Sequence, residues 1–410
     1  MAILTLENAC HLARRAGFSA SDAQFRLLTS ANSQEAAIDL LLGQSASIVE
    51  LPSWYDSAPN NREDDPELRK ILQRESLNME KELKYWWFKQ MVANTSPLQE
   101  KATLFWANHF TSSLKKVKWA PALLQQNLSL RTHAIGSFRG MLEAILQDPA
   151  MLIYLDNTNS KKQSPNENLA RELLELFTMG EGNYTEEDIK ELARALTGAS
   201  IEQRTGLYKF QHRNHDNGVK TIFGETANFT PDDVADLILR QPQTGLFITD
   251  KLWRFFVNDV PDTETIAAIS NRFVENDYDI SMLLRELFLQ EAFWAAQGEQ
   301  IKSPMELVVG SMQLLDIDML SQRQVLAFSK SMGQDLFDPP HVKGWASGKA
   351  WYTTGNLAIR EQATQYFALH AKLTPDIAQL LATDAVATLP AAEQPHYLRS
   401  ILSDPSFQIA

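Results

Sequence analysis

Acidic and basic side chains alternate at helical spacing in one segment of the sequence. Glu167, Arg171 and Glu175 follow one another at intervals of four residues, and Glu172 lies beside them. At about 100° per residue these positions share one face of a helix, so a guanidinium lies between carboxylates. Such carboxylates are candidate acid–base groups, and the arginine is a candidate partner for an anion. The alternative is a solvated face of ion pairs, which contributes little to stability.

A second group of polar side chains lies in the segment 212–220. It holds His215, Asp216 and Lys220 within a few residues of one another. A surface loop seldom needs an imidazole, a carboxylate and an ammonium group so close together, which favours a functional role. Residues 216–218 also read as an ordinary Asp-Asn-Gly turn, so a hydrated hairpin tip is the alternative.

Further candidate groups lie in aromatic and cationic segments. His109 belongs to an aromatic stretch, where a lone histidine is more often a core residue that donates to a carbonyl. Its neighbour Asn108 favours a polar pocket instead. Arg131 and Arg139 would either pair with acidic residues or place cations beside the acidic helix. The segment 337–354, rich in Pro, Gly and Trp, is expected to be a rigid loop packed by its Trp rings or a substrate lid.

If these segments lie close together in the fold, their side chains would support two kinds of chemistry. Histidines and carboxylates together would form a nitrogen and oxygen set suited to zinc, manganese or iron, with the cations left to hold an anionic substrate. Without a metal, two carboxylates would act as acid and base, and a Trp ring would serve as a platform for a sugar. A divalent metal is therefore one candidate cofactor, although no local spacing such as His-Glu-x-x-His supports it. The candidate residues are Glu167, Glu172 and Asp216 as catalytic groups, Arg131, Arg139, Arg171, Lys220 and Trp345 as substrate-binding groups, and His109 and His215 as metal ligands.

The elements that would position these groups are mostly helices. Ser164, Pro165 and Gly180 mark the start and the end of a helix over 165–179. Alternating apolar residues in 207–211 and 220–223 predict two strands of one hairpin. The predicted fold class is mainly α, a multi-helix globular bundle with one small β-hairpin. Further helices are expected over 67–92, 98–110, 123–146 and 185–196, and the expected division is an N-terminal helical segment 1–50, a loop 51–66, a central domain 67–360 and a C-terminal helical tail 361–410.

Composition limits the classes of function. The 410 residues are 44% hydrophobic and 22% charged, as in a soluble globular protein with a large core. A net charge of −13 argues against a nucleic-acid surface, because phosphate binding needs clustered cations. The single cysteine, Cys10, leaves no intrachain disulfide and no cysteine-based metal site. The sequence has no run of about 18 apolar residues, so no membrane span is predicted. As given, the chain is expected to be cytoplasmic.

Many short motifs resemble those of one bacterial family and occur in the same order. They are 11–18, 105–110, 131–139, 148–156, 165–179, 193–198, His215-Asp216 with Lys220, 251–256, 302–304 and 339–351. In these motifs the sequence resembles the family called domain of unknown function 1800, over nearly the whole chain. Relatives in that family can carry export signals before the position of His11, so a trimmed or misassigned start would make the chain an exported one. The resemblance implies no reaction, substrate or catalytic residue.

Two functions are therefore expected as alternatives. The leading one is a helical enzyme, metal-dependent or acid–base, that acts on a phosphate-, sulfate- or sugar-containing substrate. It depends on the density of polar residues between His109 and Lys220. The other is a non-catalytic binding or assembly protein, in which the same charges form structural ion-pair networks. A small molecule or a glycan is the expected ligand; nucleic acids and membranes are not expected as partners, and no protein partner is indicated.

Overall fold

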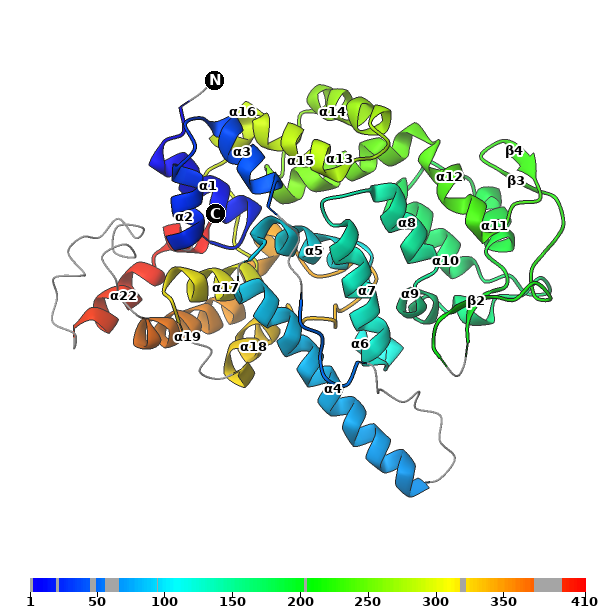
Figure 1. Cartoon of the computed structure of the whole chain (residues 1–410), viewed down its shortest axis with the longest axis horizontal. Coiled ribbons are helices and arrows are strands. Elements are labelled where there is room, and N and C mark those ends of the chain that lie inside the picture. Colours follow the sequence, from blue (N-terminus) through cyan, green and yellow to red (C-terminus); the bar gives the residue numbers. More distant parts are fainter. Residues whose placement is uncertain are drawn as a thin grey trace.

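Helices make up most of the structure. The computed structural model describes residues 3–19, 22–44, 49–55, 66–93, 95–202, 205–317, 322–371 and 393–410. Within these ranges the strands form only two small two-stranded sheets, so the mainly α prediction is confirmed. Figure 1 shows a broad helical body with the strands at one end, and the N-terminal end of α4 (Pro66–Ala93) extends away from this body.

A buried helix, α5 (Pro97–His109), lies at the centre of the fold. The helices before and after it are α1 (Leu6–Ala16), α2 (Asp22–Thr29), α3 (Gln34–Leu42), α6 (Leu114–Val117), α7 (Ala120–His133), α8 (Phe138–Leu146) and α9 (Pro149–Tyr154). Helix α5 packs against α1, α4 and α7, and even its charged residues Glu100 and Lys101 are buried. The single helix predicted over 123–146 is wrong, because Ser137 caps a new helix and separates α8 from α7.

The acidic segment differs from its predicted form. The helix α10 (Glu167–Glu172) begins later than expected, because Asn166 rather than Ser164 caps it. A π-helical turn (Leu173–Thr178) follows directly, so the segment is not one regular α-helix. Gly180 then ends the segment with a φ of 78°, as its type predicts. Turns of the π type are rare and often lie near functional sites.

The predicted hairpin is wrong in its pairing. The strand β2 (Tyr208–Phe210) pairs antiparallel with β1 (Ala199–Ile201), and β3 (Lys220–Ile222) pairs with β4 (Glu225–Ala227). The two expected strands therefore both form, but each finds another partner. Phe223 and Gly224 have φ values of 48° and 80°, and two such residues make the tight turn that favours a two-residue hairpin. This turn pairs β3 with the residues that follow it.

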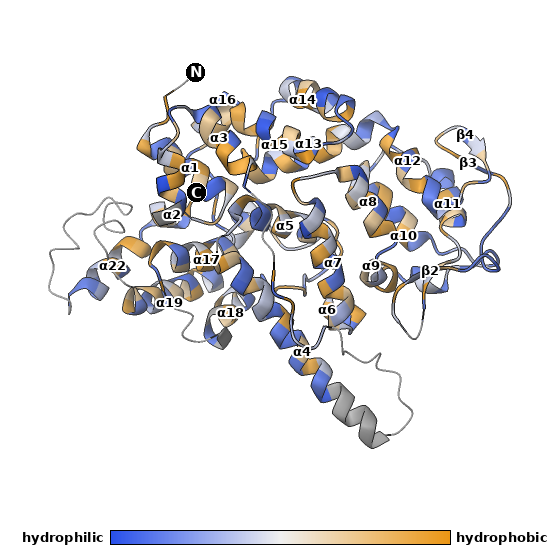
Figure 2. Cartoon of the chain, in the orientation of Figure 1, coloured by the Kyte–Doolittle hydropathy of each residue, from blue (hydrophilic) through white to orange (hydrophobic). Residues whose placement is uncertain are grey.

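The second half of the chain completes the helical body. Its helices are α11 (Glu186–Ala195), α12 (Val234–Leu239), α13 (Pro242–Phe256), α14 (Thr263–Glu275), α15 (Ile280–Leu289), α16 (Glu291–Ala295), α17 (Pro304–Leu314), α18 (Gln322–Ser331), α19 (Thr354–His370) and α22 (Gln394–Leu402). Figure 2 shows apolar and polar residues interleaved along most helices, as expected when each helix buries one face. In the described part of the chain, no helix is both long and apolar enough to span a bilayer.

Buried cations connect segments that are far apart in the sequence. Arg15 of α1 donates to the last backbone carbonyls of α13. Lys302 donates to the carbonyl of Phe407, and Arg360 of α19 donates to the carbonyl of Lys302. Helix ends and loops leave carbonyl groups without a backbone donor, and a buried cation needs oxygen atoms around it. The buried cations donate to these free carbonyl groups. Their hydrogen bonds hold the N-terminal helix, α13, α19 and residues 405–408 together.

Lys302 is expected to make stability depend on pH. Burial lowers the pKa of its ammonium group from 10.5 to about 7. Between these values the unfolded chain binds more protons than the folded chain, so the free energy of unfolding rises with pH, by at most about 1.4 kcal/mol per pH unit. Lys302→Met removes this contribution. Urea denaturation at increasing pH above 7 should therefore show the wild type gaining stability relative to this variant. Lys349→Met, at an exposed lysine, is the control and should keep the pH dependence of the wild type. Equal pH dependence in the wild type and Lys302→Met would contradict the lowered pKa of Lys302.

Candidate functional site

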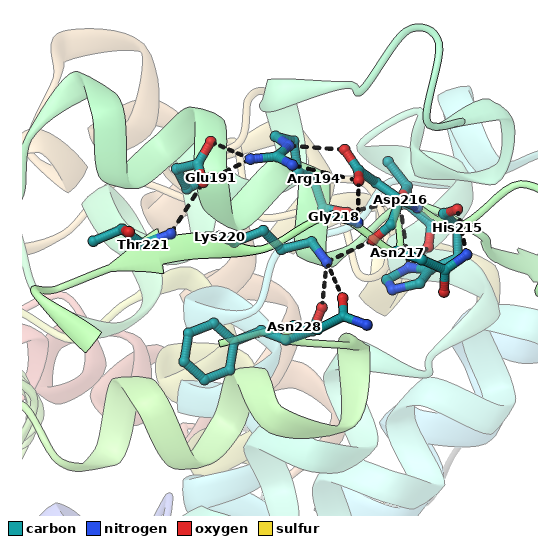
Figure 3. A network of polar contacts seen from close by, with 11 residues as sticks. Glu191, Arg194, His215, Asp216, Asn217, Gly218, Lys220, Thr221 and Asn228 are labelled. Atoms are coloured by element: carbon teal, nitrogen blue, oxygen red, sulfur yellow. Dashed lines mark hydrogen bonds and ion pairs between the residues drawn. The ribbon is translucent and has the colours of Figure 1, made fainter. Parts of the chain in front are cut away.

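The segment 212–220 joins α11 in one polar network, drawn in Figure 3. Arg194, in the last turn of α11, donates through Nε to Asp216 at 2.8 Å and through Nη1 to Glu191 at 2.7 Å. Asp216 also accepts the backbone N–H of Gly218 at 2.8 Å. The hydrogen bond from Arg194 is the main cause that holds the pKa of Asp216 below its usual value. Asp216 is therefore ionised and paired at neutral pH, and it is a poor proton donor.

Lys220 is committed to the same network. Its side chain is buried, and Nζ donates to the backbone carbonyl of Asp216, to Oδ1 of Asn228 at 2.9 Å and to the carbonyl of Phe229 at 2.8 Å. These contacts converge at the end of the side chain in Figure 3. An ammonium group has three hydrogens, so none is left for a ligand. Lys220 thus fastens β3 to the segments on either side of the second sheet.

His215 is a buried and neutral side chain. Its Nδ1 lies 2.9 Å from the carbonyl oxygen of Thr197, and because a carbonyl only accepts, Nδ1 carries the proton. Nε2 is then the unprotonated nitrogen, and it is buried without a hydrogen-bond partner. Burial is the main cause that lowers the pKa of the ring. A ligand would meet this histidine as a hydrogen-bond acceptor rather than as a cation.

The acidic helix face is an exposed network of ion pairs. Arg171 donates to both carboxylate oxygens of Glu186 at 2.8 Å and to Glu167 at 3.3 Å. Glu175, the third member of the expected row, instead accepts from Tyr184 at 3.4 Å. The π-helical turn accounts for the change, because its wider turn rotates Glu175 away from the α-helical face. Exposed fractions of 35% for the Arg171 side chain and 68% for Glu186 place these pairs in solvent.

Glu172 differs from its neighbours because, within the described residues, no group donates a hydrogen bond to its side-chain carboxylate. It is half-buried, and burial followed by the charge of Glu175 raises its pKa, which Lys343 partly opposes. Burial and then the charge of Glu172 raise the pKa of the Tyr154 phenol. A carboxyl group with a raised pKa and no fixed partner is a candidate for proton transfer.

His109 lies in the core. Its Nε2 is 2.8 Å from the carbonyl oxygen of Phe177, so Nε2 carries the proton and Nδ1 is left buried without a partner. Lys251 donates to the adjacent carbonyl of Leu176 at 3.3 Å. Both carbonyls belong to the π-helical turn, near its end, where backbone donors run out. Burial, and then Lys251, lowers the pKa of His109 well below its usual value, so the ring is neutral.

Arg131 and Arg139 both pair with acids, but in different settings. Arg131 forms a two-pronged ion pair with Glu100 of α5, and the two side chains are only 4% and 1% exposed. Arg139 pairs at the surface with Asp236 and Asp277. In the buried pair, the carboxylate fills the fork that would otherwise bind an anionic substrate. Only Nε of Arg131 has no partner.

The histidine and carboxylate candidates do not assemble into a cluster. Across the residues that the structure describes, no three His, Cys, Asp or Glu side chains lie close enough together to hold a metal ion. His215 and Asp216 are neighbours, but the imidazole is bonded to Thr197 and the carboxylate to Arg194. The metal role of His109 and His215 stays a prediction, and so do the catalytic and substrate-binding roles of the other candidates.

A small pocket lies where the loop 337–354 covers α4, α5 and α7. The backbone N–H of Trp345 donates to Oδ1 of Asn108 at 2.6 Å, which fastens the loop to the end of α5. Gly344 has a φ of 86° and approaches Asn108 so closely that no side chain would fit. The pocket is lined by Trp87, Ala107, Ser112, Gln126, Asn127, Leu130, Phe337, Pro339 and Trp345. The loop therefore covers a pocket, and of the candidate residues only Trp345 lines it.

The polar residues of this pocket were not among the candidates. Gln126 donates through Nε2 to Asp148 at 2.8 Å and accepts the hydroxyl of Ser112. Asp148 is buried, which raises its pKa to about 7. The one signal in the sequence is the run of amides at 125–127 inside an otherwise apolar helix. Amide side chains that are buried in this way need polar partners, so the run could have indicated a polar interior site.

Lys220→Met is expected to lower the free energy of unfolding by about 3 kcal/mol or more, because three buried or half-buried oxygens lose their donor. The matched control is Lys209→Met in the neighbouring sheet, where the lysine is 55% exposed and its nearest carboxylate is 3.9 Å away. That change should stay within about 0.5 kcal/mol. Urea denaturation of both variants measures the difference. Equal and small losses would mean that Lys220 is not a structural residue.

Comparisons with known proteins agree with the motif resemblance. A family model with the description Protein of unknown function (DUF1800) matches residues 11–408. No curated protein and no solved structure matches the chain. The matched range includes the polar network, the acidic helix and the loop over the pocket. The chain therefore belongs to the DUF1800 family of proteins of unknown function.

Proposed function

We propose that this protein is a non-catalytic binding protein, and that its ligand site is the pocket beneath Trp345. The proposal takes the charged residues as a scaffold. Arg194 joins α11 to the segment 212–220, Arg171 joins α10 to α11, and Arg139 joins α8 to α12. Cations that each connect two elements are what a structural network requires. Little of their bonding capacity is left for a substrate.

The observation that carries the proposal is a set of unpaired donors at the pocket. Nε1 of Trp87, Nδ2 of Asn127 and Nε1 of Trp345 are buried and have no hydrogen-bond partner in the protein. Buried polar groups nearly always have a partner, because leaving one unpaired costs about 1–3 kcal/mol. Several such groups among the residues that line one cavity support the proposal that a bound molecule completes them. The apolar walls, which include Leu130 and Phe337, would hold its remaining atoms.

A second candidate function is an acid–base enzyme in which Glu172 is the general acid. The raised pKa of Glu172 and its lack of a hydrogen-bond donor favour this role, and the π-helical turn begins at the next residue. Lys343, whose charge acts on Glu172, belongs to the same loop as Trp345 and would hold an anionic or sugar substrate there. A metal is not needed in this form of the proposal.

One pair of variants separates the two functions. Purified protein is screened for thermal stabilisation by small acids and sugars, and for hydrolysis of chromogenic phosphate, sulfate and glycoside substrates. Binding at a concentration of about 100 times Kd should stabilise the fold by about 2.7 kcal/mol. We expect Trp345→Phe to remove this stabilisation, because it deletes the indole N–H while an aromatic ring remains, and we expect Glu172→Gln to leave it unchanged. Turnover that disappears in Glu172→Gln, at unchanged melting temperature, would reject the binding function in favour of the enzyme.

A further inference from the structure

The unpaired groups at the pocket are all hydrogen-bond donors. An indole N–H can only donate, so the unpaired atoms of Trp87 and Trp345 are both hydrogen-bond donors. The amide of Asn127 is oriented by Arg131, whose Nη2 lies 3.5 Å from its Oδ1, so Nδ2 is the atom left without a partner. The pocket therefore lacks acceptors for the hydrogens that surround it.

The side-chain oxygens that line the pocket are already engaged. Asp148 accepts from Nε2 of Gln126 at 2.8 Å, which turns Oε1 of Gln126 toward Ser112. The hydroxyl hydrogen of Ser112 is then directed to Gln126. Oγ of Ser112 keeps its lone pairs and can still accept, whereas the unpaired N–H groups can only donate. A group that only accepts therefore matches these N–H groups.

Size and charge narrow the class of ligand. The pocket has room for about one water-sized particle, so it holds a single acceptor atom and not the whole of a tetrahedral phosphate or sulfate. Hydrogen bonds from N–H groups to an anion are stronger than those to a neutral acceptor. Nη2 of Arg131 lies 3.5 Å from Oδ1 of Asn127, so the amide oxygen is engaged and Nδ2 is the atom free to donate. These features favour a negatively charged acceptor.

We propose that the pocket beneath Trp345 binds the acceptor atom of a small monoanion, a halide or the carboxylate of a small acid. The N–H groups of Trp87, Asn127 and Trp345 are its donors. The proposal rests on the proposed binding function and names the chemistry of its ligand. It adds a selectivity that the binding function alone does not contain, namely acceptance of compact monoanions and rejection of sulfate and phosphate.

The test is an NMR titration of the indole N–H resonances in uniformly labelled full-length protein. The chain contains nine tryptophans, and Trp87→Phe and Trp345→Phe identify the two resonances of interest. Sodium chloride, sodium bromide and sodium acetate are titrated separately against sodium sulfate at matched ionic strength. We expect both resonances to shift saturably with chloride or acetate and not with sulfate. Asn127→Leu should weaken the binding about tenfold or more, because a donor to an anion is lost.

A matched control and the contrary outcomes complete the test. Asn159→Leu changes an exposed asparagine and should leave the anion affinity unchanged. Saturable shifts with the halides alone identify a monatomic anion, and shifts with acetate as well identify a carboxylate site; both support the proposal. Shifts equal to those with sulfate, or an affinity that Asn127→Leu does not change, would overturn it. If stabilisation by another ligand were still lost in Trp345→Phe, the binding function would stand while the monoanion proposal failed.

Discussion

The fold depends on supplying oxygen atoms to positive charges that it buries. The cations Arg15, Lys101, Arg131, Lys220, Lys302 and Arg360 are each less than 10% exposed. An unpaired buried charge would cost several kcal/mol, so each needs its partners in the packed structure. Lys101 and Arg131 use the carboxylates of Glu306 and Glu100, and the others rely mainly on backbone carbonyls. This constraint fixes how the terminal helices meet the centre.

The need to pair buried charges also explains why residues of the types that act in catalysis do not form an open site. Lys220 and Asp216 lie side by side, as acid–base chemistry would require, but their hydrogen-bonding capacity is used within the network of Figure 3. His109 likewise serves a carbonyl at the end of the π-helical turn. Three of the residues that line the pocket beneath Trp345 carry buried donors that have no partner in the protein. This pocket is therefore the place where we propose that a ligand binds.

Local structure could be predicted from the sequence better than the partner of each polar side chain. Helix signals such as Thr185 before α11 and Gly180 after the acidic segment act over a few residues, so they could be predicted. The π-helical turn could not, because side-chain donors from other helices complete its carbonyls. The pairing of β3 was missed because a Phe-Gly turn is not a strong hairpin signal. The pocket was missed because Trp87 and Asn127 meet only through packing of distant helices.

The central claim is that buried, paired charges hold the fold together. A double-mutant cycle on Glu100 and Arg131 tests it most directly, since both side chains of this ion pair are almost fully buried. The free energy of unfolding is measured for Glu100→Gln, Arg131→Met and the double variant. Each single change should cost about 3–5 kcal/mol, because it leaves the other charge buried without a partner. The double variant should lose much less than the sum of the two. Small and additive losses would contradict the claim that the buried charges hold the fold together.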